Sequence, residues 1–476
     1  MVRTRNEGVL DCPPASNDGF FGIGCFVGRQ NLIDGSVADR MSGDTPTQAV
    51  EFLDDRCIRF LLECVDTVIL SAFIVLYGVS AAFYGKVVAK DEAYKELSVF
   101  IDALRKINDD YVESPDLQKV QDGAMRGLIE ALDPYSAFLT KEQLAALEKR
   151  KAAGMAGIGV ALSKRADLIY VVSTERNGPA EEAGLRPGDY LIAVDGVNVE
   201  DKSIVETESL LRGPEGSKAR VSVFRSTRTK PAELEITRKA DVPMPVGARM
   251  VERNIGLLEI SSLGGATVEQ ARVKLKTLIS AGAQSLILDL RGCADGSLAE
   301  GAELANFFVP EGVIYYSKNR LGEKVEEVRS NPARFITDHP LAVLINGSTG
   351  GAAEVVAGAL KDHKRATLIG EKTFGIGSSQ KRISLKSGAV IVLSTAKIYT
   401  PNGKMIQDET MRNTGIKPDI QPPDEDRHQD LLVETYYDDL DDSGKYKKLR
   451  DTISKEQIEK AVEFLMKSQA SVKKAA

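Results

Sequence analysis

Residues 344–380 contain the stretch that decides the fold: LINGSTGGAAEVVAGAL (344–360), followed by KDHKRATLIGEKTFGIGSSQ (361–380). The apolar run 341–345, which leads into this stretch, predicts a buried strand. Gly347, Gly350 and Gly351 predict a turn, and the Ala- and Val-rich residues after them predict a helix. A strand, a glycine-rich turn and a helix in this order indicate an α/β domain.

The same alternation extends upstream and downstream of this stretch. Further strands are predicted at 255–263, 285–290 and 390–394, and helical patterns lie at 267–281 and 299–308. We therefore expect an α/β layered core over residues 245–425.

A separate β-rich domain is expected over residues 155–241. Short Val/Ile/Leu runs alternate there with turns marked by Gly and Pro. The segment AGLRPGD (183–189) supplies a Gly helix stop and a Pro turn before a strand.

The N-terminal part of the chain divides into three regions. Residues 1–66 form an expected flexible tail, and an over-extended translation start is the alternative for residues 1 to about 50. Residues 67–85 are an uncharged run of 19 residues, which as a helix would span roughly 28 Å, about the thickness of a bilayer core. This run is a membrane anchor or a cleaved signal segment, and we expect an uncleaved anchor. Residues 89–150 show helical periodicity.

Composition excludes several classes of function. The net charge of -7, with no basic stripe, argues against nucleic-acid binding. The three His residues are scattered, so no metal or other cofactor is expected. Cys293 is the one Cys in the main body and is interpreted as a small buried side chain. An acidic run and a helix at 455–468 make up the expected C-terminal tail, residues 426–476.

Ordered motifs over residues 89–425 resemble those of the C-terminal processing (tail-specific) peptidases, which use a Ser nucleophile and a Lys general base. The family's nucleophile block has the form S-A-S-A-S-E-I, and its base block has the form G-E-x-T-F-G-K-G-x-x-Q. Aligned on Glu354, the nucleophile falls on Gly351; aligned on TFG (373–375), the base falls on Ile376. The two alignments give a spacing of 25 residues, which is also the family's spacing.

The resemblance implies a multidomain α+β fold. It would combine an N-terminal membrane helix, a helical segment, a PDZ-like β-rich domain and an α/β serine-peptidase-like core. The PDZ match includes Gly157, Ile158, Gly159 and Val160, whose backbone N–H groups would hold a peptide carboxylate. A PDZ-like fold that binds nothing is the alternative. The LDPYS segment (132–136) matches an N-terminal signature of the family.

The expected catalytic site has neither the nucleophile nor the general base of the family. Glycine has no nucleophile and isoleucine cannot accept a proton, so Gly351 and Ile376 cannot form a Ser–Lys dyad. Gln380 matches the residue that orients the base in the family. In the oxyanion region, formed by Asp295, Gly296 and Ala352, Asp295 replaces a glycine, and its carboxylate would oppose a developing negative charge.

Three hypotheses about function follow. The first is a membrane-anchored, catalytically impaired homologue that binds protein C-termini as an adaptor or regulator of an active protease. The second is an active serine endopeptidase that uses Ser348 or Thr349 with Lys372, although a shift of three residues moves a side chain far from a dyad. The third is an envelope structural or assembly protein. The family resemblance places the main body outside the cytoplasm.

Overall fold

The computed structural model describes residue 75 and residues 97–165, 168–225, 230–240, 246–408, 414–421 and 445–475. The expected tail (1–66) lies outside the described residues, as does the expected anchor (67–85) apart from Val75. No helix within the described ranges is both long and apolar enough to cross a membrane. The chain divides into two compact units, Met1–Ile107 and Asn108–Ala476.

Helices precede the two larger domains. In the first unit, residues 97–107 are helical, and the side chains of Leu97, Phe100 and Ile101 are exposed. The second unit contains helix α2 (Leu117–Glu130). This helix is amphipathic, but none of its residues is buried. Asp116 caps α2, because its carboxylate accepts a hydrogen bond from the N–H of Lys119 at 3.1 Å.

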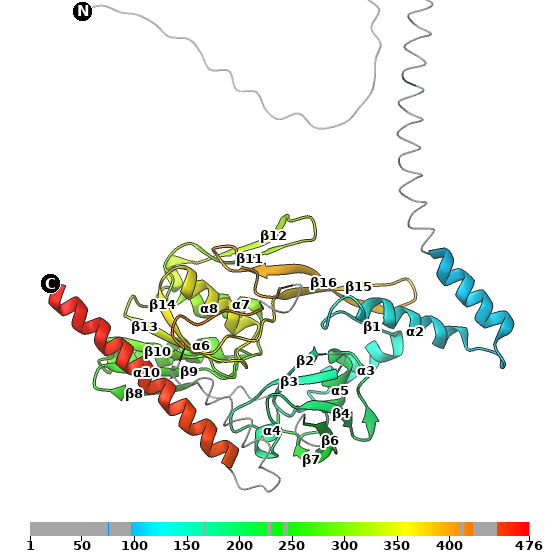
Figure 1. The fold of residues 1–476 in the computed structure, drawn as a ribbon, viewed down its shortest axis with the longest axis horizontal. Helices are drawn as coiled ribbons and strands as arrows, with labels where there is room; N and C mark the ends of the chain where they lie inside the picture. Colours follow the sequence, from blue (N-terminus) through cyan, green and yellow to red (C-terminus); the bar gives the residue numbers. More distant parts are fainter. Residues whose placement is uncertain are drawn as a thin grey trace, which may run out of the picture. The chain divides into compact units, whose positions relative to one another are not determined.

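The α/β core is built on a five-stranded sheet (Figure 1). Its order is β14 (Ala366–Gly370), β13 (Leu341–Ile345), β10 (Ser285–Asp289), β9 (Ile255–Glu259) and β8 (Gly247–Glu252). The first four strands run parallel, and β8 joins the edge antiparallel. Because β10 and β13 are buried along their whole lengths, they form near-continuous apolar runs, as expected for strands covered on both faces.

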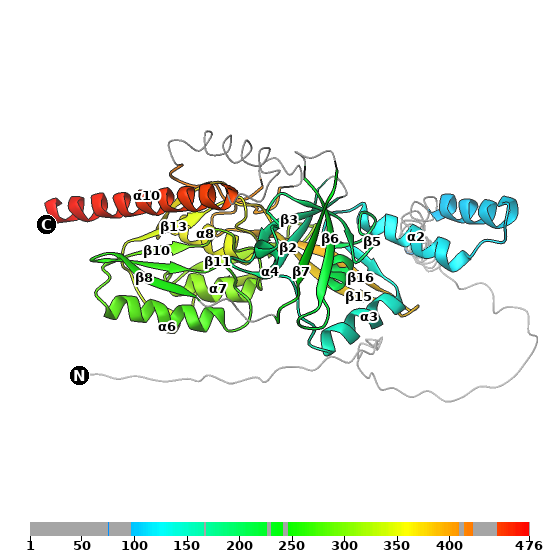
Figure 2. The same cartoon turned by 90° about the horizontal axis from the view of Figure 1, so that it is seen from below.

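Helices cover both faces of this sheet (Figures 1 and 2). One face packs in a single core cluster with α6 (Thr267–Ser280), α7 (Leu298–Asn306) and α8 (Ala352–Asp362). The other face packs against α10 (Lys445–Ala475), through Ala461 and Leu465 among others. The helix expected at 455–468 is therefore longer, and its apolar stripe completes the core rather than forming part of a tail.

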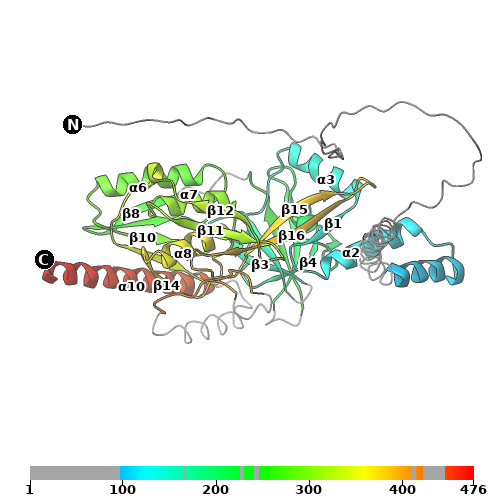
Figure 3. The same cartoon turned by 90° about the horizontal axis from the view of Figure 1, so that it is seen from above.

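A second sheet lies beside α8 and is visible in Figure 3. Strands β1 (Ala137–Leu139), β16 (Val390–Tyr399), β11 (Val313–Lys318) and β12 (Lys324–Arg329) follow in this order, and β15 (Ser378–Ser384) also pairs with β16. Helix α3 (Lys141–Ala152) follows β1. Strand β16 extends beyond the predicted 390–394 because its second half pairs with β11.

The β-rich domain has its own apolar core. Its six strands and two helices are β2 (Val160–Arg165), β3 (Leu168–Thr174), α4 (Pro179–Glu182), β4 (Tyr190–Val194), β5 (Val197–Asn198), α5 (Ile204–Leu211), β6 (Lys218–Phe224) and β7 (Ala232–Thr237). Strand β2 is at one edge of the sheet, where a peptide could add as a further strand.

Candidate functional site

The turn between β13 and α8 has a backbone shape that only glycine adopts without strain. Gly351, the residue before α8, has φ 55° and ψ −115°. A methyl group built on Gly351 would meet no atom within 4 Å. The turn thus presents an open position between a strand and a helix, which is where nucleophile elbows hold a serine.

Glu354 connects this turn to the loop after β14. Its side chain is completely buried. Oε1 accepts hydrogen bonds from Thr373 Oγ1 at 2.5 Å and from the N–H of Gly375 at 2.7 Å. Oε2 accepts from the N–H of Ile376 at 2.7 Å and from the N–H of Gly351 at 3.0 Å. The structure therefore brings the two dyad-equivalent positions together on one carboxylate oxygen.

Opposing effects set the pKa of Glu354. Burial raises it, while the Thr373 hydroxyl and the N–H groups of Ile376, Gly351 and Gly375 lower it, and the outcome is a pKa of about 7. In the sequence analysis Glu354 served only to align the nucleophile block, because three of its four hydrogen-bond donors lie on a loop 19 to 22 residues further along the chain.

An apolar side chain occupies the position expected for the base. The Cδ1 atom of Ile376 lies 3.1 Å from where a methyl group on Gly350 would stand, and Cβ of Ala294 lies 3.2 Å from the same point. Gly350 is held there because its N–H donates to the carbonyl of Cys293 at 2.9 Å. No group at this position can accept a proton from a nucleophile at 351.

In the oxyanion region, Asp295 is held by two hydrogen-bond donors. Its carboxylate accepts hydrogen bonds from Ser262 Oγ at 2.6 Å and from the N–H of Leu263 at 3.0 Å, so it is engaged by the loop after β9. Burial raises the pKa of Asp295, and the Ser262 hydroxyl acts against this rise. Gly296 (φ 92°) packs tightly on Leu263, since a methyl group there would lie 2.6 Å from Leu263 Cβ. Ala352 is buried as the first residue of α8.

No hydrogen bond among the described residues joins Lys372 to either substitute nucleophile, Ser348 or Thr349. Thr349 is completely buried, and its hydroxyl donates to the carbonyl of Leu290 at 2.9 Å. Ser348 is partly exposed, and Lys372 is exposed on the loop after β14. Cys293 is buried, and burial raises the pKa of its thiol far above the ordinary value. A buried thiol of this kind is not a nucleophile at neutral pH.

Gln380 takes part in a polar chain that reaches the LDPYS segment. Its Nε2 donates to Ser378 Oγ at 2.9 Å and to Ser394 Oγ at 3.3 Å. Ser394 Oγ donates to Asp133 at 2.9 Å, and the N–H of Ser394 donates to Ser136 Oγ at 3.1 Å. The sequence interpretation missed this role of the LDPYS segment, because the contact joins residues far apart in the chain.

The glycine loop before β2 presents two backbone donors. The N–H of Gly157 donates to the carbonyl of Lys239 at 3.1 Å, so it is not available to a ligand, in contrast to the expectation. The N–H groups of Ile158 and Gly159 have no acceptor among the described residues. Val160 begins β2. This loop therefore offers adjacent donors at the end of an edge strand, as carboxylate capture requires.

A carboxylate side chain lies against the same loop. A methyl group built on Gly159, which has φ 71°, would lie 2.7 Å from Glu175 Oε2. Gly159 thus cannot be replaced without displacing Glu175. A negative charge in this place disfavours a second carboxylate nearby.

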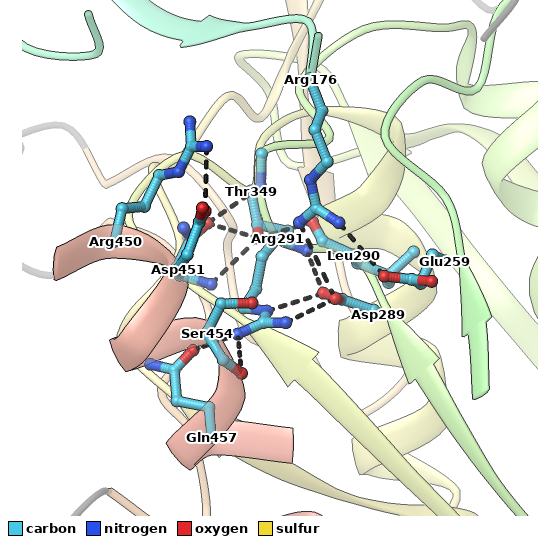
Figure 4. A network of polar contacts seen from close by, with 12 residues as sticks. Arg176, Glu259, Asp289, Leu290, Arg291, Thr349, Arg450, Asp451, Ser454 and Gln457 are labelled. Carbon is cyan, nitrogen blue, oxygen red and sulfur yellow. Dashed lines mark hydrogen bonds and ion pairs between the residues drawn. The ribbon is translucent and has the colours of Figure 1, made fainter. Parts of the chain in front are cut away.

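A buried ion pair lies at the carboxyl end of β10 and is shown in Figure 4. Two nitrogens of Arg291 donate to Asp289, at 2.8 and 2.6 Å. The third, Nη1, donates to Gln457 Oε1 at 2.6 Å and to the carbonyl of Ser454 at 3.2 Å, both on α10. Burial would raise the pKa of Asp289, but the Arg291 guanidinium outweighs it and lowers the pKa.

Arginines extend this network to the β-rich domain (Figure 4). Arg176 pairs with Glu259 at 3.2 Å and approaches Asp289 at 4.0 Å. Arg450 of α10 pairs with Glu181 of α4. A third contact places the Arg165 guanidinium 4.4 Å from the ring centroid of Tyr170 and 4.8 Å from that of Phe374, in the loop that contains Ile376.

Comparisons with known proteins agree with this architecture. The profile of peptidase family S41 matches residues 254–421, and that of the PDZ domain matches residues 170–225. The chain is 31% identical over 367 residues to a carboxy-terminal-processing protease of Bartonella bacilliformis, covering 76% of this chain and 82% of that protein. It is 33% identical over 303 residues to a carboxyl-terminal-processing protease of Synechocystis sp., covering 62% and 69%. A solved structure, the photosystem II D1 C-terminal processing protease, is similar with a TM-score of 0.57 at 26% identity, covering 68% of this chain and 92% of that one.

Proposed function

Because the chain belongs to peptidase family S41 and contains a PDZ domain, we propose that it is a catalytically impaired homologue of the carboxy-terminal-processing proteases. It would bind the C-termini of peptides or proteins through its PDZ domain. The observation that carries the proposal is the pair Gly351 and Ile376, held on Glu354 with neither a nucleophile nor a base.

Such a protein acts by binding. A polypeptide end captured at the glycine loop before β2 (residues 157–160), here the PDZ loop, would be held by a protein that lacks the groups to cut it. This suits an adaptor, or a regulator that competes with an active protease for the same ends. The N–H groups of Ile158 and Gly159 supply the donors for the carboxylate.

The binding test compares one peptide, ending in apolar residues, as the free acid and as the C-terminal amide. Calorimetry should detect binding of the acid only, since an amide removes the charge that the loop recognises. Gly159→Ala should abolish binding, because the added methyl group collides with Glu175. Gly216→Ala is the matched control: it has a similar φ of 77°, and its methyl group would meet nothing within 4 Å. Equal affinity for acid and amide would overturn the proposal.

A substitution of Glu175 should change the affinity for the peptide in the opposite direction, toward tighter binding. Glu175→Gln removes a negative charge beside the proposed carboxylate position, so the free-acid peptide should bind several-fold more tightly. The amide should be unaffected. A loss of affinity for the free acid would place the carboxylate elsewhere.

We also propose that residues 67–85 anchor the chain in a membrane, with the PDZ domain and the peptidase-like core outside the cytoplasm. The support is the uncharged run of 19 residues between Asp66 and Lys86. An anchored protein stays in the membrane fraction after alkaline carbonate washing, and externally added protease degrades the main body in intact cells. Release by carbonate, or protection from the protease, would contradict the respective half of this proposal.

A further inference from the structure

Three lysines stand side by side on one face of the second sheet. In the ladder, Lys318 of β11 is paired with both Lys324 of β12 and Lys397 of β16. Lys397 is in turn paired with Ser378 of β15. Because paired residues on neighbouring strands point to the same face, these side chains form a continuous row, here called the lysine row (Lys318, Lys324 and Lys397).

Two stacked tyrosine rings lie beneath the ammonium groups of the lysine row. The rings of Tyr316 and Tyr399 stack with centroids 5.3 Å apart and planes 4° apart. Lys324 Nζ lies 4.6 Å from the centroid of Tyr316, and Lys318 Nζ lies 5.3 Å from that of Tyr399. The ammonium groups are thus held over aromatic faces.

Only one of the three positive charges of the lysine row is paired with a carboxylate of the described residues. Lys324 pairs with Glu327 at 2.6 Å. No carboxylate of the described residues forms an ion pair with Lys318 or Lys397. Like charges directly opposite one another on neighbouring strands destabilise a sheet. Binding of an anionic ligand would relieve this repulsion among the three lysines.

The row also leads toward the candidate site. Ser378, the next residue along it, is two positions after Ile376 in sequence, and its hydroxyl accepts a hydrogen bond from Gln380. An extended chain crossing β12, β11 and β16 in that direction would approach the loop that contains Ile376. Neighbouring strands are about 4.8 Å apart, and alternate side chains of an extended polypeptide are about 6.6 Å apart. Flexible lysine side chains can span this difference.

We infer that the lysine row and the stacked tyrosines bind an acidic segment of a polypeptide partner, with acidic residues at alternate positions, leading it toward the loop that contains Ile376. This inference rests on the proposed function and specifies the chemistry of the partner. The peptidase-family core and the PDZ domain favour a polypeptide over a nucleic acid as the anionic occupant.

The test uses a fluorescein-labelled peptide of alternating Glu and Ser, with an amidated C-terminus, and measures fluorescence anisotropy. The amide removes any contribution of carboxylate capture at the PDZ loop, so this result is independent of whether the proposed C-terminus binding is correct. The same peptide with Gln in place of Glu is the neutral control. Binding of the acidic peptide that weakens with added salt is expected.

Charge-neutral variants separate the lysine row from general surface charge. Lys318→Gln/Lys324→Gln/Lys397→Gln should weaken binding by about tenfold or more, from three lost charge contacts. The control Lys381→Gln/Arg382→Gln/Lys386→Gln removes three positive charges from exposed positions of β15 and the turn after it, and should leave affinity within about twofold.

Each of the following results would overturn the inference. The acidic peptide does not bind the native protein; the two triple variants lose affinity equally; or the neutral peptide binds as well as the acidic one. Tighter binding of a single-stranded oligothymidine through the same three lysines would also overturn it, because the face would then select a nucleic acid.

Discussion

Glu354 concentrates four hydrogen bonds on one buried carboxyl group whose pKa is raised from 4.5 to about 7. The folded chain therefore binds this proton more tightly than the unfolded chain does. The contribution of Glu354 to stability is fully present below pH about 4.5 and is lost as the pH rises through about 7, by roughly 3 kcal/mol. Urea unfolding of the native protein and of Glu354→Gln, at pH values between about 4.5 and about 7, measures the difference in their free energies of unfolding.

The variant is the reference in this comparison. Glu354→Gln has no proton to lose, so the native protein should lose stability relative to the variant as the pH rises from about 5 to about 7.5. A constant difference between the two proteins across the interval would show that Glu354 does not titrate there.

Gly351 can be tested against a glycine in an ordinary conformation. Its φ of 55° and ψ of −115° predict that Gly351→Ala costs about 1–3 kcal/mol, although nothing obstructs the methyl group. Gly123→Ala in the exposed helix α2, where a methyl group also has open space, should instead stabilise by about 0.5–1 kcal/mol. Thermal unfolding of both variants gives the comparison, and a neutral Gly351→Ala would mean that the turn is not strained.

At the scale of elements, β10 and α10 are joined by the Asp289–Arg291 pair. Arg291→Met should destabilise by about 3–5 kcal/mol, because it removes the hydrogen-bonded cation of the buried Asp289 carboxylate and leaves only Arg176 at 4.0 Å. Arg249→Met, which removes an exposed arginine that lies 3.6 Å from Glu259, should cost less than about 1 kcal/mol. Guanidinium chloride unfolding distinguishes the two, and equal costs would contradict the assigned role.

The same pair has a pH signature opposite in sign to that of Glu354. The pKa of Asp289 is lowered in the folded chain. Its stabilising contribution is therefore present at neutral pH and is lost as the pH falls through the folded pKa. The Asp289→Asn/Arg291→Met double variant should lose stability less steeply on acidification than the native protein.

Elements with strong local patterns could be predicted from the sequence. The strand at 341–345 has the same bounds in the structure, and the helix predicted at 267–281 is α6. Strand ends that depend on pairing with another strand could not be predicted from local patterns. Strand β9 ends at Glu259 rather than at 263, and β16 extends to Tyr399 through its pairing with β11.

At the scale of the whole molecule, motif spacing could align positions 351 and 376 because each lies in a distinctive local motif. The carboxylate that holds them together, the Glu175 side chain at the PDZ loop and the lysine row depend on contacts through space. Such contacts leave no periodic signal in one sequence. The hydrogen bond between Ser262 and Asp295 could not be predicted for the same reason, since Ser262 follows a different strand.

The central claim is that an intact peptidase scaffold has lost its dyad. The most direct measurement is cleavage of an unstructured substrate with apolar C-terminal residues, followed by mass spectrometry, for the native protein and for Gly351→Ser/Ile376→Lys. We expect no products from the native protein or from either single variant, and products from the double variant. Cleavage by the native protein at a rate that Gly351→Ser/Ile376→Lys does not raise would contradict the claim.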